Sequence, residues 1–70
     1  MNPAPISVLI NQQSHLFPPG ATLADAIEWV GMQPPFAAAI NMEFVPRGQY
    51  PERILQNNDA IELIAPITGG

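Results

Sequence analysis

The sequence predicts an α+β fold in which a single helix covers one face of a β-sheet. Three observations support this prediction. Apolar and polar residues alternate near both ends of the chain, a polar turn follows the first alternating segment, and one amphipathic stretch with capping residues lies between them. The 70 residues suffice for one small domain, which we place at residues 1–65, with an exposed tail at residues 66–70.

A β-hairpin is predicted over residues 6–17. Residues 6–10 carry apolar side chains at alternate positions, residues 11–13 form a polar turn, and residues 14–17 return as the second strand. Pro-Pro-Gly at residues 18–20 ends the hairpin, because proline donates no ladder hydrogen bond and glycine permits the chain to reverse.

The helix is predicted to begin at residue 23 and to end at about residue 30 or 31. Thr22 is a good N-cap, and Asp25 three residues later gives an arrangement that resembles a capping box. Apolar residues recur at helical spacing through this stretch, so one face would be buried and the other solvated. Gly31 suits the position after the helix, and a Pro-Pro pair soon afterwards prevents its continuation.

Strands are also expected in the middle of the chain and near its end. Residues 37–41 and residues 44–45 are candidates for two short strands, and Pro46 ends the second. Residues 60–65 alternate clearly and form the closing strand, which Pro66 ends.

An irregular or 3₁₀ connection is expected over residues 49–55. Tyr50 and Ile54 are the candidates in it to fill the core. Asn-Asn-Asp at residues 57–59 is predicted to form a turn before the closing strand.

One helix covers only one face of a sheet, so the opposite face needs an explanation. Leu9 and Ile64 fall on the opposite pleat from the residues that would face the helix. An exposed apolar patch often marks the site of a partner, whereas scattered exposed aliphatic side chains are common on any protein. Both interpretations stay open at this point.

The composition excludes several classes of function. The chain has no cysteine and no lysine, which excludes disulfides, thiolate ligands, a cysteine nucleophile and Schiff-base chemistry. A formal charge of −4 disfavours nucleic acid and favours a basic partner surface. No apolar run approaches the roughly 20 residues of a membrane span, and no signal peptide is evident, so we expect a cytoplasmic protein without membrane association.

Titratable residues inside the chain predict no catalytic or metal site. His15 is the single histidine and has no cysteine or paired nucleophile to work with. Asp25 and Glu28 lie on the solvated side of the predicted helix, and residues 57–59 lack the ligand spacing of a calcium loop. Arg47 is one of two arginines, each of which either pairs with an acidic residue or contacts a partner.

The last three residues, Thr68-Gly69-Gly70, are the remaining candidate for chemistry. A Gly-Gly end places a free carboxylate on a backbone without side chains, which could enter a narrow active site. Adenylation by ATP would give the carboxylate a good leaving group, and a sulfur nucleophile could then convert Gly70 to a thiocarboxylate. The alternative is a tail without a chemical role, since chain termini are commonly disordered.

Several segments together resemble the ThiS-type sulfur-carrier proteins of thiamin biosynthesis, which have a ubiquitin-like β-grasp fold. They include Ala-Ile-Asn and Phe-Val-Pro-Arg in the middle of the chain, Asn-Asp-Ala-Ile-Glu near its end, and the tail. The full set, with the opening strand and the start of the helix, comprises residues 6–12, 22–23, 39–41, 44–47, 58–62 and 66–70. The resemblance implies a mixed sheet of four to five strands with one helix packed on one face. One departure is Asn58, where the family commonly has glycine, but asparagine tolerates the left-handed conformation and the turn should persist.

The resemblance implies a protein co-substrate rather than an enzyme. Gly70 would be adenylated by an E1-like adenylyltransferase that consumes ATP, would receive sulfur from a sulfur-donor protein, and would supply that sulfur to thiazole synthase. The chain itself would bind no cofactor and would be monomeric when free. The residues expected to contact these enzymes lie in the tail, on the uncovered side of the sheet and in the Val-Pro-Arg segment: Gly69, Thr68, Ile67, Pro66, Ile64, Leu9 and Arg47.

Two other functions stay open. The small subunit of molybdopterin synthase uses the same kind of terminus for a different acceptor, although the Val-Pro-Arg segment together with this tail favours the thiazole branch. A ubiquitin-like modifier or a binding module would instead form an amide through its tail, or would use no terminal chemistry.

Overall fold

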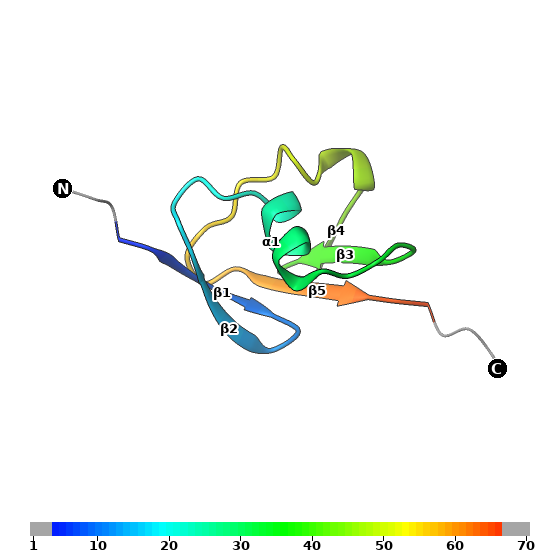
Figure 1. The fold of residues 1–70 in the computed structure, drawn as a ribbon, viewed down its shortest axis with the longest axis horizontal. Coiled ribbons are helices and arrows are strands. Elements are labelled where there is room, and N and C mark those ends of the chain that lie inside the picture. The colour runs from blue at the N-terminus through cyan, green and yellow to red at the C-terminus, as the bar shows by residue number, and fades with distance from the viewer. Residues whose placement is uncertain (1–3, 67–70) are drawn as a thin grey trace.

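The computed structural model describes residues 4–66 (Figure 1). Five strands, one α-helix and one 3₁₀ helix occur in them: β1 (Ile6–Ile10), β2 (Gln13–Phe17), α1 (Leu23–Val30), β3 (Ala37–Ile40), β4 (Glu43–Val45), η1 (Arg47–Gln49) and β5 (Ala60–Ile64). Ile67, Thr68, Gly69 and Gly70 lie outside the described residues, so the expectations placed on them stay predictions.

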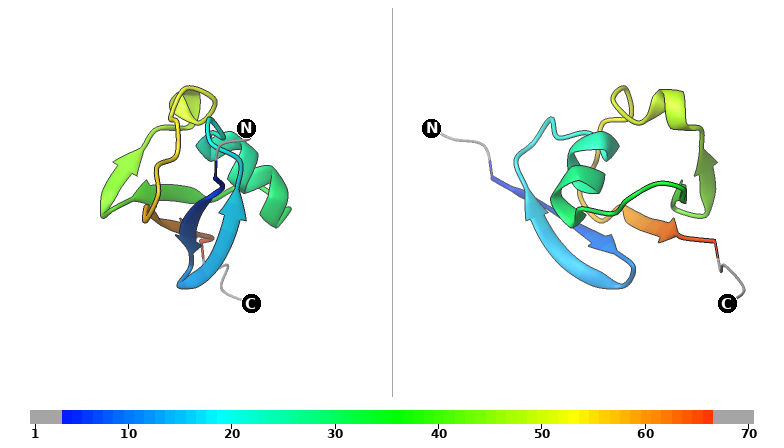
Figure 2. Two further views of the ribbon diagram at one scale, coloured as in Figure 1. Left: turned by 90° about the vertical axis from the view of Figure 1, so that its left-hand side faces the viewer. Right: turned by 45° about the vertical axis from the view of Figure 1, so that its right-hand side comes forward.

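The strands form one mixed sheet in the order β2-β1-β5-β3-β4. The central strands β1 and β5 are parallel, and all other neighbours are antiparallel. Helix α1 packs on one face of the sheet, and no helix or strand within residues 4–66 covers the other face (Figure 2). The predicted α+β class, with one helix on one face, is confirmed.

Two-residue turns join both hairpins. Asn11 (φ 49°) and Gln12 (φ 72°) link β1 to β2, and Asn41 (φ 52°) and Met42 (φ 70°) link β3 to β4. Positive φ at both central residues is typical of the type I′ turn, whose twist matches that of the flanking strands, and asparagine tolerates this conformation well. The first turn is therefore one residue shorter than predicted, and β2 begins at Gln13.

Helix α1 has the predicted bounds because both of its ends are capped. Thr22 Oγ1 accepts a hydrogen bond from the Asp25 N–H (3.2 Å), and Asp25 Oδ2 accepts one from the Thr22 N–H (2.9 Å), which completes the capping box. At the other end Gly31 has a φ of 77°, and its N–H donates to the Ile27 carbonyl (3.0 Å). The helix therefore begins and ends through local interactions.

The core lies between α1 and the sheet face that α1 covers. Its largest fully buried side chains come from four elements: Val8 of β1, Leu23 of α1, Ile40 of β3 and Ile61 of β5. They belong to one cluster of buried apolar residues, so the helix and the sheet share a single core.

The connection between β4 and β5 agrees in part with the prediction. Residues 50–55 form no helix or named strand, as expected for an irregular connection, and a 3₁₀ helix lies just before them at Arg47–Gln49. Ile54 is 58% exposed, so the prediction that it fills the core is wrong, whereas Leu55 is only 3% exposed. An isolated bridge to Thr22 holds Ile54 in extended backbone, where successive side chains point in opposite directions. Tyr50 packs against the core, as predicted.

Strand ends also differ from the prediction, each by one residue. β3 ends at Ile40 because Asn41 enters the turn, and β4 therefore begins at Glu43. β5 ends at Ile64, so Ala65 is exposed and does not extend the buried face of that strand.

The predicted turn at residues 57–59 is present. Asn58 has a φ of 72°, a left-handed conformation that asparagine tolerates, so the turn persists as expected. Asp59 is 7% exposed and accepts hydrogen bonds from the Gln56 N–H (2.8 Å) and from Asn41 Nδ2 (3.0 Å). These bonds compensate the burial of the carboxylate and fix the start of β5.

Candidate functional site

The face of the sheet opposite α1 carries exposed apolar side chains from four strands. We call it the uncovered face, and the strand register places ten residues on it: Ser7, Leu9, Ser14, Leu16, Ala37, Ala39, Phe44, Ala60, Glu62 and Ile64. Leu9 is 41% exposed and Ile64 is 56% exposed, so the predicted orientation of both side chains is confirmed.

Two further apolar residues on this face were missed in the sequence. Leu16 is 68% exposed on β2, and Phe44 is 69% exposed on β4. Leu16 lies opposite Ser7 in the hairpin, and Phe44 precedes the buried Val45, so strand alternation was a usable signal for both. With them the apolar side chains extend from one edge strand of the sheet to the other. An exposed apolar surface of this extent is typical of a protein-binding site.

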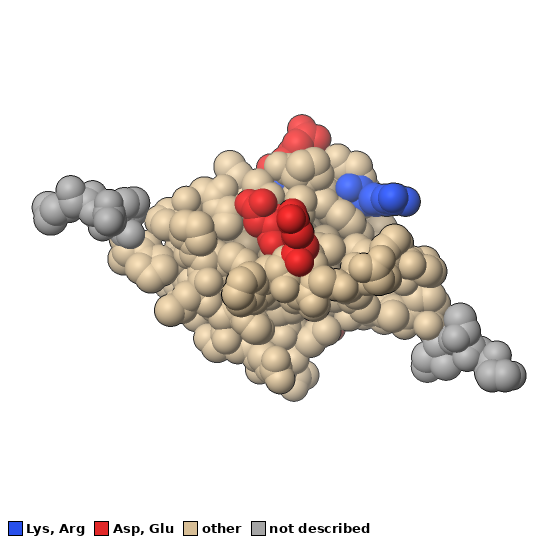
Figure 3. Space-filling model, in the orientation of Figure 1, with Lys and Arg blue, Asp and Glu red and all other residues tan. Residues whose placement is uncertain are grey.

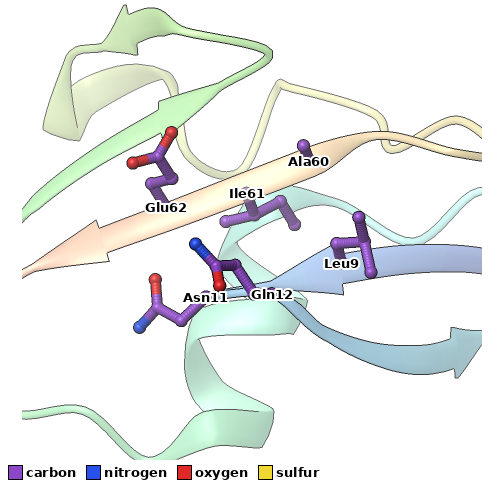
Figure 4. A pocket seen from close by; sticks show the side chains of 6 residues that line it. All are labelled: Leu9, Asn11, Gln12, Ala60, Ile61 and Glu62. Atoms are coloured by element: carbon purple, nitrogen blue, oxygen red, sulfur yellow. The ribbon is translucent and has the colours of Figure 1, made fainter.

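The uncovered face has a hollow of about 260 Å³ between β1 and β5. Figure 4 shows the residues that line it: Leu9, Asn11, Gln12, Ala60, Ile61 and Glu62. Glu62 is the single ionisable residue among the ten that define this face. A face of this composition suits a protein partner with a mainly apolar contact surface.

Leu9 and Ile64 lie at different ends of the uncovered face. Leu9 pairs with Ala60, which precedes Ile64 by four residues on β5, a separation of about 13 Å along a strand. Ile64 is the last residue of β5, and the exposed Pro66 is the last described residue after it. The chain therefore leaves the domain from a central strand, beside the Ile64 end of the uncovered face (Figure 1).

Arg47 does not lie on the uncovered face. It begins η1, and the segment that follows is hydrogen-bonded to the start of α1: the Ala24 N–H donates to the Tyr50 carbonyl (3.0 Å), and the Leu23 N–H donates to the Arg53 carbonyl (2.8 Å). Arg47 is thus exposed on the helix side of the sheet, and its contact with a partner stays a prediction.

Both signs of charge occur on the helix side. Asp25 and Glu28 are exposed on α1, and Figure 3 shows acidic groups at the centre of this view, a further acidic group at its upper edge and a cationic group toward the right. Within residues 4–66 no group of three His, Asp or Glu residues could hold a metal ion. His15 is a half-buried residue of β2 opposite Val8, so the predicted strand position is confirmed. No helix in that part of the chain is long and apolar enough to cross a membrane.

Comparison with known proteins identifies the family. The model of the ThiS family matches residues 3–70, which is almost the whole chain and includes the Gly-Gly end. The chain belongs to the ThiS family. The sulfur carrier protein ThiS of Escherichia coli (strain K12) is 35% identical over 66 residues, which cover 93% of this chain and 100% of that protein. The resemblance seen in the sequence segments is thereby confirmed.

A solved ThiS structure has the same fold. The crystal structure of the thiamine biosynthesis protein ThiS from Geobacter metallireducens matches with a TM-score of 0.77 and covers 93% of this chain and 100% of that one. The sequence identity is 13%, so the likeness is one of fold. It confirms the predicted β-grasp architecture for this ThiS-family chain.

Proposed function

We propose that this chain is a sulfur carrier of thiamin biosynthesis and that it carries sulfur as a thiocarboxylate on Gly70. The observation that carries the proposal is the match to the ThiS family through residue 70, together with 35% identity to a sulfur carrier over that relative's full length. The family match favours the thiazole branch over the molybdopterin branch and over a ubiquitin-like modifier. The chain serves as a protein co-substrate and is not itself the catalyst.

The proposed chemistry has two stages. A carboxylate oxygen of Gly70 attacks the α-phosphorus of ATP and displaces pyrophosphate, which yields an acyl-adenylate. A sulfur nucleophile then attacks the carbonyl carbon, and AMP leaves with the electrons of the C–O bond. When the nucleophile is a persulfide, a thiol subsequently breaks the S–S bond of the acyl disulfide, which leaves the thiocarboxylate and a new disulfide. The chain supplies no thiol, because it has no cysteine.

The partners in this proposal are an E1-like adenylyltransferase that consumes ATP, a sulfur-donor protein and thiazole synthase. The apolar uncovered face and its hollow beside Leu9 and Glu62 offer these enzymes a contact surface. Ile64 joins this face to the exposed Pro66, where the tail begins. A partner that covers the Ile64 end of the face would have residues 67–70 within reach of its active site.

The intact mass of the chain tests the proposed chemistry. We expect incubation with the adenylyltransferase, ATP and a sulfur donor to replace one oxygen by sulfur, and fragmentation to locate the sulfur at Gly70. The matched control omits ATP and should leave the mass unchanged. A chain that is turned over as a substrate but never shows this exchange would exclude the thiocarboxylate.

A further inference from the structure

The side chain of Asn11 binds both backbone groups of one residue of β5. Asn11 Oδ1 accepts a hydrogen bond from the Leu63 N–H (2.9 Å), and Asn11 Nδ2 donates to the Leu63 carbonyl (3.3 Å). The two residues are 52 positions apart in the chain. Asn11 lies at the end of β1, where the hairpin turns away from β5 (Figure 4).

These two bonds continue the sheet beyond the point where β1 stops. The parallel pairing of β1 with β5 ends at Ile10 and Ile61, after which the Asn11 N–H donates to the Ile61 carbonyl (2.9 Å). Asn11 then adopts a φ of 49°, and its backbone leaves the strand direction. A side-chain amide has one carbonyl and one N–H₂ group, so it offers Leu63 the donor and the acceptor that a next strand residue would have offered.

Leu63 is the last residue of β5 that forms hydrogen bonds to Asn11, on the side of β5 that faces β1. On the other side, β3 pairs with β5 as far as Ile64 through Ala37. Without the Asn11 amide, the end of β5 would be held by β3 alone. Gly70 is seven positions after Leu63, a reach of at most about 25 Å. The direction of the chain at Leu63 therefore limits where Gly70 arrives.

Asn41 is a natural counterpart at the other end of β5. It also begins a two-residue turn, with a φ of 52°, and it also binds β5 through its side chain. Asn41 Oδ1 accepts from the Ala60 N–H (3.0 Å), and Asn41 Nδ2 donates to Asp59 Oδ1 (3.0 Å). One asparagine thus fixes the start of β5, and the other fixes the end from which the tail departs.

We propose that Asn11 is a positioning residue for the reactive terminus: its hydrogen bonds to Leu63 fix the direction of the chain at residues 64–66, where it leaves the domain. The inference rests on the proposed function. Asn11 lines one end of the hollow, but it is not among the ten residues that define the uncovered face, and the exposed apolar side chains Leu9, Leu16, Phe44 and Ile64 are kept when the amide is lost. Binding to the adenylyltransferase should therefore persist. The terminal carboxylate, however, would be aligned with ATP less often, and a misplacement of about 1 Å can cost 10²-fold in rate.

The test compares Asn11→Gly with Asn41→Gly. Glycine readily adopts the positive φ of either turn, and it removes the whole side chain, including the amide, in both variants. Adenylation is followed by ATP–pyrophosphate exchange with the adenylyltransferase, at a temperature where both variants are folded. We expect Asn11→Gly to lower kcat about tenfold or more at an unchanged KM for the chain. Asn41→Gly should keep the parent kcat and KM, even if it lowers the melting temperature equally.

Equal kcat values for Asn11→Gly and the parent, or equal losses in both variants, would overturn the positioning role. If Asn11→Gly does not fold, the positioning role is tested with Asn11→Asp instead. This variant keeps the acceptor for the Leu63 N–H and loses the donor to the Leu63 carbonyl. A reduced kcat at the parent KM then supports the role, and the parent kcat overturns it. Failure of the proposed function is recognised separately, because the parent chain itself would then support no exchange.

Discussion

Removal of Gly70 abolishes thiocarboxylate formation and leaves the domain folded. The shortened chain still ends in a glycine, Gly69, so the chemistry of the carboxylate is unchanged. Its position changes, because one residue of extended backbone spans about 3.5 Å. Misplacement on this scale lowers the rate of adenylation by at least about 100-fold. The buried residues of the core all lie between Val8 and Leu63, so the free energy of unfolding should change by less than about 0.5 kcal/mol.

Two measurements distinguish a terminal carboxylate that no longer reaches the active site from a chain that no longer binds the adenylyltransferase. Calorimetric titration with the adenylyltransferase should give nearly the parent affinity, since the uncovered face is intact in the shortened chain. Intact mass after incubation with ATP and a sulfur donor should show no exchange of oxygen for sulfur. Thiocarboxylate formation at the parent rate on Gly69 would contradict the assignment of Gly70 as the reacting residue.

Substitution of Ile64 by aspartate weakens binding to the adenylyltransferase by about tenfold or more. Ile64 lies on the uncovered face beside the departing tail and is 56% exposed. A carboxylate there would have to be desolvated in an apolar contact, and an unpaired charge in such a contact typically costs at least about 1.4 kcal/mol, which is tenfold in affinity. The dissociation constant of the complex, measured by calorimetry, checks this expectation.

Ile54→Asp is the matched control for this substitution. Ile54 is 58% exposed, nearly the same fraction as Ile64, but it lies in the connection hydrogen-bonded beside the start of α1. The same chemical change therefore occurs away from the uncovered face, and we expect the affinity to stay within about twofold of the parent value. Equal losses in the two variants would show that binding does not depend on the uncovered face.

Local signals account for most of the fold that was predicted. The capping residues Thr22 and Asp25 determine where α1 begins, and Gly31 determines where it ends. Alternation along β1 predicted that Leu9 faces away from the helix, and its 41% exposure agrees. These features depend on residues close in sequence, so they can be identified without knowledge of the tertiary structure.

Features that depend on distant residues could not be predicted in this way. The choice between Ile54 and Leu55 as the buried residue depends on the bridge from Ile54 to Thr22, which no local pattern indicates. The contact between Asn11 and Leu63 depends on β1 and β5 being parallel neighbours. Asparagine is common in polar turns, so nothing in the sequence indicates that the Asn11 side chain also binds Leu63. That contact is evident only when β1 and β5 lie side by side in the sheet.

Sulfur transfer from this chain to the thiazole is the most direct test of the proposed function. The chain is first prepared as its Gly70 thiocarboxylate with a heavy sulfur isotope and is then given to thiazole synthase with the other substrates. We expect the label to appear in the thiazole in a single turnover, while the chain returns to its carboxylate form. A labelled thiocarboxylate that persists while unlabelled thiazole forms would contradict the proposal that this chain is the sulfur carrier.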